Sequence, residues 1–198
     1  SDIVVSSRIR LARNLADVPF PPAAGKEALL EVLNRVRRAA QHLPEARRYQ
    51  LLELMRLSPL ERQVLIEKHL VSPEHVKEPE GRGVILRDDE AVSIMVNEED
   101  HLRLQVLLPG LNLDAAWDLA GRLDDSLEQQ LDFAFDEKLG FLTACPTNVG
   151  SGLRASIMLH LPALVLLNQA GQAFTTLSQF GVVVRGLYGE GTQALGNF

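Results

Sequence analysis

A run of charged side chains lies at residues 97–103, where the sequence reads Asn-Glu-Glu-Asp-His-Leu-Arg. The apolar run at 91–96 predicts a strand, so these side chains would lie at or just beyond a strand end. Carboxylates there can orient or deprotonate a substrate, and an arginine can bind a phosphate or a carboxylate. The alternative is a polar strand exit with a solvated edge, and this stretch alone favours that alternative.

A second pattern is the recurrence of arginine at strand ends or beside turns rich in Gly and Ser, at Arg8, Arg10, Arg103, Arg154 and Arg185. Glu98, Glu99 and Glu190 occupy similar places. Guanidinium groups on rigid elements form a permanently charged clamp for phosphates, so five converging arginines could replace a P-loop. The alternative is five ordinary arginines in ion pairs with an excess of acids, and spacing alone leaves both open.

Other chemistries have little support in the sequence. It contains no Walker A sequence, no dinucleotide fingerprint and no metal-ligand spacing of His or Cys. The Gly-Ser-Gly run at 150–152 is too weak to count as a phosphate loop. Cys145 has no base beside it in the sequence and is typical of a packed core cysteine.

Composition indicates an ordinary globular protein. The 198 residues suit one domain, and a net charge of −6 gives no basic footprint for nucleic acid, although local arginines can still bind an anion. The most apolar segment, at 157–167, is too short to span a membrane. A single cysteine excludes an internal disulfide framework and fits a reducing, cytoplasmic compartment. Both ends of the chain read as cut, so we expect a fragment.

The elements that must position these residues suggest an α+β fold. Apolar periodicity predicts helices at 26–43, 58–69, 113–134, 162–169 and 174–180, the fourth of them buried, and a mobile loop at 71–83. Strands are expected at 2–6, 83–87, 91–96, 141–144 and 181–187, with a further candidate at 48–57. Arg8 and Arg10 would share a face of an extended segment, or belong to an exposed basic edge strand. Hairpins without βαβ alternation predict a mainly antiparallel sheet flanked by helices.

Four separate motifs then carry a resemblance. They are SSRIR at 6–10, NEEDHLR at 97–103, CPTN at 145–148 with GLRAS at 152–156, and Arg185-Gly186 with Gly189-Glu190. In this order, over nearly the whole chain, they resemble the phosphagen (guanidino) kinase family. The stretches at 185–192 and 67–70 resemble its bacterial protein arginine kinase branch. Metabolite kinases of the family usually have a His where this chain has Gly191. The resemblance implies that 1–198 is a guanidino kinase catalytic domain lacking its C-terminal part.

The resemblance also implies a site. The five arginines would hold the phosphates of ATP, and His69 would lie against the nucleotide. Glu99 and Glu190 would grip the guanidinium of the substrate, with Cys145 near its nitrogen. Mg²⁺ would be held mainly through the ATP phosphates, with no dedicated protein ligands. The remaining nucleotide-binding positions would be Ser6, Ser7, Ile9, Ala155, Ser156, Ile157, Met158, Gly186, Leu187, Tyr188, Gly189 and Glu190.

The implied activity is transfer of the ATP γ-phosphoryl group to arginine side chains of proteins, marking them for proteolysis. The implied partners are protein substrates with accessible arginines, an activator protein and protease machinery, with a homodimer possible and neither nucleic acid nor membrane involved. One alternative with the same fold is a kinase of free guanidines such as arginine. Another, of a different class, is a non-catalytic fragment that binds nucleotide or a protein partner.

Overall fold

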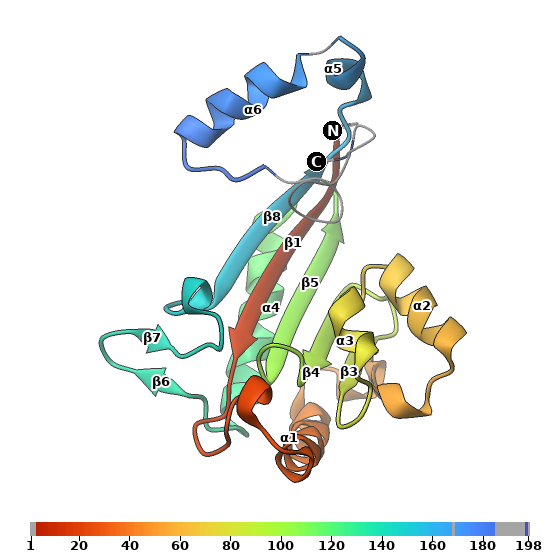
Figure 1. Cartoon of the computed structure of the whole chain (residues 1–198), viewed down its shortest axis with the longest axis vertical. Helices are drawn as coiled ribbons and strands as arrows, with labels where there is room; N and C mark the ends of the chain where they lie inside the picture. Colours follow the sequence, from red (N-terminus) through yellow and green to blue (C-terminus); the bar gives the residue numbers. More distant parts are fainter. Residues whose placement is uncertain (1–2, 168, 185–196, 198) are drawn as a thin grey trace.

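The computed structural model describes residues 3–167, 169–184 and 197. Its centre is a six-stranded sheet in the order β2-β3-β4-β5-β1-β8 (Figure 1). All neighbouring pairs are antiparallel, which confirms the predicted α+β class with a mainly antiparallel sheet. The strands are β1 (Val4–Arg13), β2 (Tyr49–Glu53), β3 (Gly83–Arg87), β4 (Val92–Val96), β5 (Leu102–Pro109) and β8 (Leu153–Leu159), with β6 (Phe135–Asp136) and β7 (Gly140–Phe141) forming a separate ribbon.

Two long helices, α1 (Lys26–Ala39) and α4 (Leu113–Glu128), cover one face of this sheet. Alternate residues of the central strands, such as Ile9 and Leu104, enter a core with Val36 of α1 and Leu123 of α4. In Figure 1, α4 lies behind β1, β5 and β8. The main core therefore fills the space between the sheet and these two helices.

The opposite face carries a smaller layer over β3 and β4 only. The helices α2 (Pro59–Glu67) and α3 (Pro73–Lys77) lie there, and Leu65 and Leu70 pack with Val84 and Met95. Among the described elements, none covers the near face of β1, β5 and β8 in Figure 1, while α5 (Pro162–Leu166) and α6 (Ala170–Gln179) lie beyond the end of β8. Short 3-10 turns complete the chain at Pro21–Ala23, Ala40–His42, Ala46–Arg48, Leu54–Arg56 and Pro146–Asn148.

Local sequence accounts for several element boundaries. Ser58 and Glu61 form a reciprocal capping box at the start of α2, as serine three residues before glutamate predicts. Gly110 adopts a φ of +67° in the turn after β5, a conformation that costs a glycine little. The hairpin β3–β4 is confirmed close to its predicted bounds.

Several expected elements differ from the structure. The strand expected at 2–6 is the longer β1, which also contains Arg8 and Arg10. β1 pairs with both β5 and β8, so the alternative of an exposed edge strand is wrong. The loop expected at 71–83 contains α3, and the strand expected at 141–144 is reduced to the end of β7. The helix at 162–169 was expected to be buried, yet α5 has no buried residue. Residues 181–184 form no strand, and the remainder of that predicted strand lies outside the described residues.

The helix expected at 113–134 ends at Glu128 for a tertiary reason. The N–H of Ala16 donates to the carbonyl of Asp132, and the N–H of Ala134 donates to the carbonyl of Asn14. The backbone at 132–134 is therefore used to join the segment after β1. Leu131 and Ala134 are buried as the apolar periodicity indicates, but both lie beyond the end of the helix, and Leu131 is in a bend.

Candidate functional site

Four of the five predicted arginines lie together on the uncovered face of the sheet. Arg8 and Arg10 alternate along β1, and Arg10 is directly opposite Arg154 of β8. Arg103 of β5 is opposite Ala12, two residues further along β1, so it points to the same face. Antiparallel register thus brings together side chains separated by about a hundred and fifty positions in the sequence. Arg185 lies outside the described residues.

The charges of these arginines repel one another. Burial lowers the pKa of Arg10 to about 9, helped by the positive charges of Arg8, Arg103 and Arg154 and opposed by Glu98. The pKa of Arg8 is lowered by burial and then by Arg103 and Arg154. An anion placed among them would relieve this repulsion. The Nε of Arg103 is also buried without a hydrogen-bond partner among the described residues, which adds to the cost of holding this charge.

Short polar contacts fix two of these guanidinium groups. The Nε of Arg8 donates to the Ser156 hydroxyl at 3.2 Å. Nη1 of Arg103 lies 2.8 Å from Oε2 of Glu98, whose other oxygen accepts a hydrogen bond from Ser72 just before α3. Glu98 therefore links the arginine face to the segment that carries α2 and α3.

A second link to that segment involves Gln105, which lies directly opposite both Arg10 and Ser93 in the sheet. Its side-chain nitrogen donates to the carbonyl of His69 at 2.9 Å. His69 has a φ of +57°, which turns the chain between α2 and α3. The backbone of His69 thus lies beside the arginine face. Its contact with a nucleotide stays a prediction.

The stretch at 97–103 divides into buried and exposed members. Asn97 is buried, and its side-chain nitrogen donates to the carbonyls of Leu29 and Gly81 at 2.8 and 2.7 Å. Asp100 and His101 are buried as well, whereas Glu99 is exposed. Burial suits Asp100 and His101 to structural roles rather than to contact with a substrate. The catalytic role of Glu99 is untested and stays a prediction.

His101 is a neutral structural histidine. Its Nδ1 accepts a hydrogen bond from the N–H of Leu15 at 3.1 Å, which leaves Nε2 to donate to the carbonyl of Pro19 at 3.1 Å. Burial lowers its pKa to about 4. Its imidazole is therefore neutral near neutral pH, and both ring nitrogens are engaged with backbone groups.

Cys145 lies in the loop between β7 and β8 and is half-buried. Its Sγ is 3.0 Å from the Thr147 hydroxyl, and its carbonyl accepts a hydrogen bond from the Thr143 hydroxyl. The neighbouring N–H of Ala144 donates to Oδ1 of Asp100 at 2.7 Å. The residue before Cys145 is thus bonded to the residue after Glu99.

The other predicted nucleotide-binding residues fall on both faces of the sheet. Ser6, Ser156 and Met158 share the arginine face by strand alternation. Ile9 is buried in the core, and Ala155 and Ile157 point to the same side as Ile9, so only their backbone atoms are available to a ligand on the arginine face. Ser7 is buried and bonded to the turn after β5. Gly186, Leu187, Tyr188, Gly189 and Glu190 lie outside the described residues.

The contacts of Gln105, Ser72 and Asn14 were not anticipated from the sequence. Gln105 could have been found, because it is two residues after Arg103 in a strand and so shares its face. Ser72 and Asn14 carry no local signal, since their partners are distant in the sequence.

Metal ligation and membrane insertion were also considered. Within the described residues, no group of three or more His, Cys, Asp or Glu side chains is arranged to hold a metal ion. In the same part of the chain, no helix is long and apolar enough to cross a membrane.

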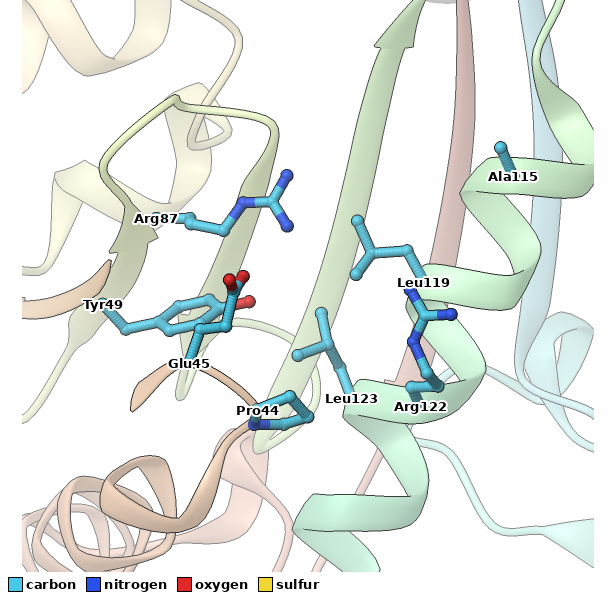
Figure 2. Close-up of a pocket in the computed structure, with 8 residues that line it drawn as sticks. All are labelled: Pro44, Glu45, Tyr49, Arg87, Ala115, Leu119, Arg122 and Leu123. Carbon is cyan, nitrogen blue, oxygen red and sulfur yellow. The ribbon is translucent and has the colours of Figure 1, made fainter. Parts of the chain in front are cut away.

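A pocket of about 350 Å³ lies on the other face of the sheet (Figure 2). Leu119 and Arg122 of α4 face Tyr49, Arg87 and Glu45 across it. Arg87 already donates to Asp89 at 2.7 Å, and the carboxylate of Glu45 adds negative charge. This pocket is separate from the arginine face and lacks its excess of positive charge.

Comparison with known proteins gives a consistent result. Residues 31–198 match the family described as ATP:guanido phosphotransferase, C-terminal catalytic domain. Protein-arginine kinases of Desulforamulus reducens and Symbiobacterium thermophilum are both 58% identical to this chain, over 100% and 99% of its length. The chain covers 56% of each of them, so it spans about half the length of these curated relatives.

Solved structures agree on the fold. The substrate-free duplicated taurocyamine kinase of Schistosoma mansoni superimposes with a TM-score of 0.84 and 29% identity, covering 98% of this chain and 28% of that one. Lombricine kinase superimposes with a TM-score of 0.83 and 26% identity, covering 96% of this chain and 56% of that one. Both superpositions extend over nearly all of the chain.

Proposed function

The chain belongs to the ATP:guanido phosphotransferase family, and from this premise we propose that it transfers the γ-phosphoryl group of ATP to arginine side chains of proteins. The observation that carries the proposal is the cluster of Arg8, Arg10, Arg103 and Arg154 on one open face of the sheet. Phosphoryl transfer requires mainly positioning and neutralisation of charge, and these arginines would supply both to a polyphosphate. The 58% identity to protein-arginine kinases favours protein-bound arginine over free guanidines as the acceptor.

In the proposed reaction, one terminal nitrogen of the acceptor guanidinium attacks the γ-phosphorus. An N–P bond forms, the bond from that phosphorus to the β–γ bridging oxygen breaks, and ADP leaves with the bond's electrons. The nitrogen loses one proton, which a carboxylate accepts. A guanidinium has a pKa above about 12, so it is a poor nucleophile until a carboxylate orients it and takes the proton.

We assign the carboxylate roles to Glu99 and Glu190 and place Cys145 beside the reacting nitrogen. Glu99 is exposed, and its neighbour Glu98 forms an ion pair with Arg103 of the arginine face, which supports placing the acceptor next to the phosphates. Mg²⁺ would supply charge neutralisation between the phosphates. We place this ion mainly on the phosphates of ATP and on water, because Mg²⁺ keeps several waters and is usually bound through substrate phosphates.

The wider setting is part of the proposal. The family resemblance supports protein substrates with accessible arginines that are marked for proteolysis, together with an activator protein, protease machinery and a possible homodimer. The single cysteine supports a reducing, cytoplasmic compartment.

The test offers two acceptors in one reaction. The chain is incubated with Mg²⁺, ATP labelled on its γ-phosphate, a protein substrate and free arginine. We expect acid-labile label on the protein and none on a matched substrate whose arginines are replaced by lysine. Label on free arginine alone would replace the proposal with a free-guanidine kinase. Binding of nucleotide without any transfer would indicate a non-catalytic fragment.

Variants in the same assay test the carboxylate roles. Glu99→Gln and Glu190→Gln should each abolish transfer while ATP binding, measured by calorimetry, is largely kept, because the arginines are untouched. Cys145→Ala should lower the rate less than either. Near-normal turnover by one of the glutamine variants would refute the carboxylate-pair mechanism.

A further inference from the structure

We infer that the buried pair Asn14–Asp100 is a positioning device that sets Glu99 and Cys145 relative to each other. This inference rests on the proposed function, because it concerns the two residues assigned to the acceptor guanidinium. Asp100 follows Glu99 directly, and Ala144 precedes Cys145 directly. One carboxylate oxygen joins the two segments.

That oxygen is Oδ1 of Asp100. It accepts a hydrogen bond from Nδ2 of Asn14 at 2.6 Å and another from the N–H of Ala144 at 2.7 Å. Asp100 is only 3% exposed. A carboxylate this deeply buried is costly unless it is well bonded, and both bonds are short. They hold the two segments by a contact stronger than one between neutral groups.

Asn14 provides the frame for this carboxylate. Its Oδ1 accepts from the N–H of His101 at 2.8 Å, and its Nδ2 also donates to the carbonyl of Leu142 at 3.1 Å. Asn14 therefore contacts His101, the residue after Asp100, and also Leu142 at the start of the loop that carries Cys145. Asn14 is only 1% exposed, and both polar atoms of its side chain form hydrogen bonds to these segments.

The far end of the loop is held independently by Arg13. Its Nη1 donates to the carbonyl of Ser151 at 2.9 Å, and its Nη2 pairs with Asp124 of α4 at 2.6 Å. Its guanidinium also stacks on the ring of Phe141 at 3.6 Å. Loss of the Asp100 contact would consequently release the Cys145 side of the loop while the other end stays attached.

Cys145 is the only cysteine in the sequence, so its alkylation by iodoacetamide reports on this loop alone. We compare the parent chain with Asp100→Ala and Asp100→Asn. In the first, the N–H of Ala144 has no acceptor, and the half-buried thiol should react about tenfold faster or more, the scale expected for a lost bond to a charged group. In the second, the amide oxygen can replace Oδ1, and the rate should rise much less.

A control separates local release from general destabilisation. His75→Ala removes another buried side chain, whose Nε2 is 2.9 Å from the carbonyl of Gly83, far from this loop in the sequence. Circular dichroism establishes that each variant is folded at the temperature of the assay. We expect the His75→Ala rate to equal the parent rate. Equal rates for the parent and Asp100→Ala, or an equal increase in His75→Ala, would overturn the inference.

A kinetic measurement adds a second readout. Asp100→Ala should lower kcat for transfer while KM for ATP is kept, because the arginine face is unchanged, and Asp100→Asn should recover most of the rate. A parallel rise in KM for ATP would contradict a role confined to the acceptor side. If the parent chain transfers no phosphoryl group, the proposed function fails, while the alkylation rates still decide whether Asp100 holds the loop.

Discussion

Arg10 lies among three other guanidinium groups, and this placement has opposite consequences for stability and for binding. Its pKa is lowered to about 9 by burial and by Arg8, Arg103 and Arg154, which means that its charge is held at a cost in the unliganded chain. A polyphosphate would convert the repulsion into attraction. A site built for an anion is expected to have this property, whereas an arginine placed for stability would face a carboxylate.

Arg10→Gln should therefore bind ATP more weakly and melt at a higher temperature. We expect a loss of affinity of about tenfold or more, the scale of one charge-assisted hydrogen bond, and a rise in Tm of roughly 2–4 °C, which corresponds to relief of about 1 kcal/mol. Calorimetry and a thermal melt without nucleotide measure the two effects.

The matched control is Arg122→Gln, because Arg122 is an exposed arginine of α4 beside the pocket on the other face of the sheet. It should leave ATP affinity unchanged. Unaltered affinity in Arg10→Gln, or an equal loss in both variants, would show that the cluster does not hold the phosphates.

At the scale of elements, α3 and the turn after β1 are each attached through a neutral histidine. His75 of α3 is buried beside the carbonyl of Gly83, and burial lowers its pKa to about 4. His101 holds Leu15 and Pro19 in the same way, also with a pKa of about 4. Both side chains bind a proton less readily in the folded chain than the ordinary value of 6.5 implies.

The sign of the pH effect follows from proton counts. Between pH 6.5 and about 4 the unfolded chain binds more protons at these two histidines than the folded chain does, so the free energy of unfolding falls as pH falls. Each histidine contributes at most about 1.4 kcal/mol per pH unit in this window. Urea unfolding at several pH values between 5 and 7 measures the slope. His75→Gln should make this slope smaller, because it removes one of the two histidines whose pKa is lowered by burial. A stability independent of pH across this window would contradict the assignment.

How far the sequence predicts these elements depends on how local their causes are. The capping box of α2 and the hairpin β3–β4 are set by neighbouring residues, and both are confirmed. The end of α4 and the interior position of β1 depend on partners distant in the sequence. The periodicity misjudged the first, and the sequence made no prediction of the second. α3 was missed because its five residues are too few to give a helical period.

The same distinction applies to the site. Alternation along β1 correctly placed Arg8 and Arg10 on one face, but their proximity to Arg103 and Arg154 depends on strand register. The family resemblance predicted that Arg103 and Arg154 belong to the same site. The Asn14–Asp100 hydrogen bond could not be predicted from the sequence, because the two residues are 86 positions apart.

At the scale of the whole molecule, one face of the sheet packs against α1 and α4, and the other face carries the arginines. Some large apolar side chains near β8 stay exposed. The core between the sheet and α1 and α4 is closed, yet β8 is the last strand of the sheet among the described residues. Beyond it, Leu166 is 82% exposed and Phe180 is 78% exposed. A strand edge next to exposed large apolar side chains favours association.

We therefore expect the 198-residue chain to self-associate. Its weight-average mass, measured by light scattering after gel filtration, should rise between roughly 1 and 100 μM, the range in which exposed apolar surface promotes association. Leu166→Glu combined with Phe180→Glu should keep the mass near that of a monomer, because two carboxylates would have to be desolvated in the contact. Leu60→Glu is the control, since Leu60 is 74% exposed on α2, away from this edge. A parent chain that stays monomeric throughout and melts cooperatively at a high midpoint would show that the exposed residues near β8 are tolerated without a covering partner.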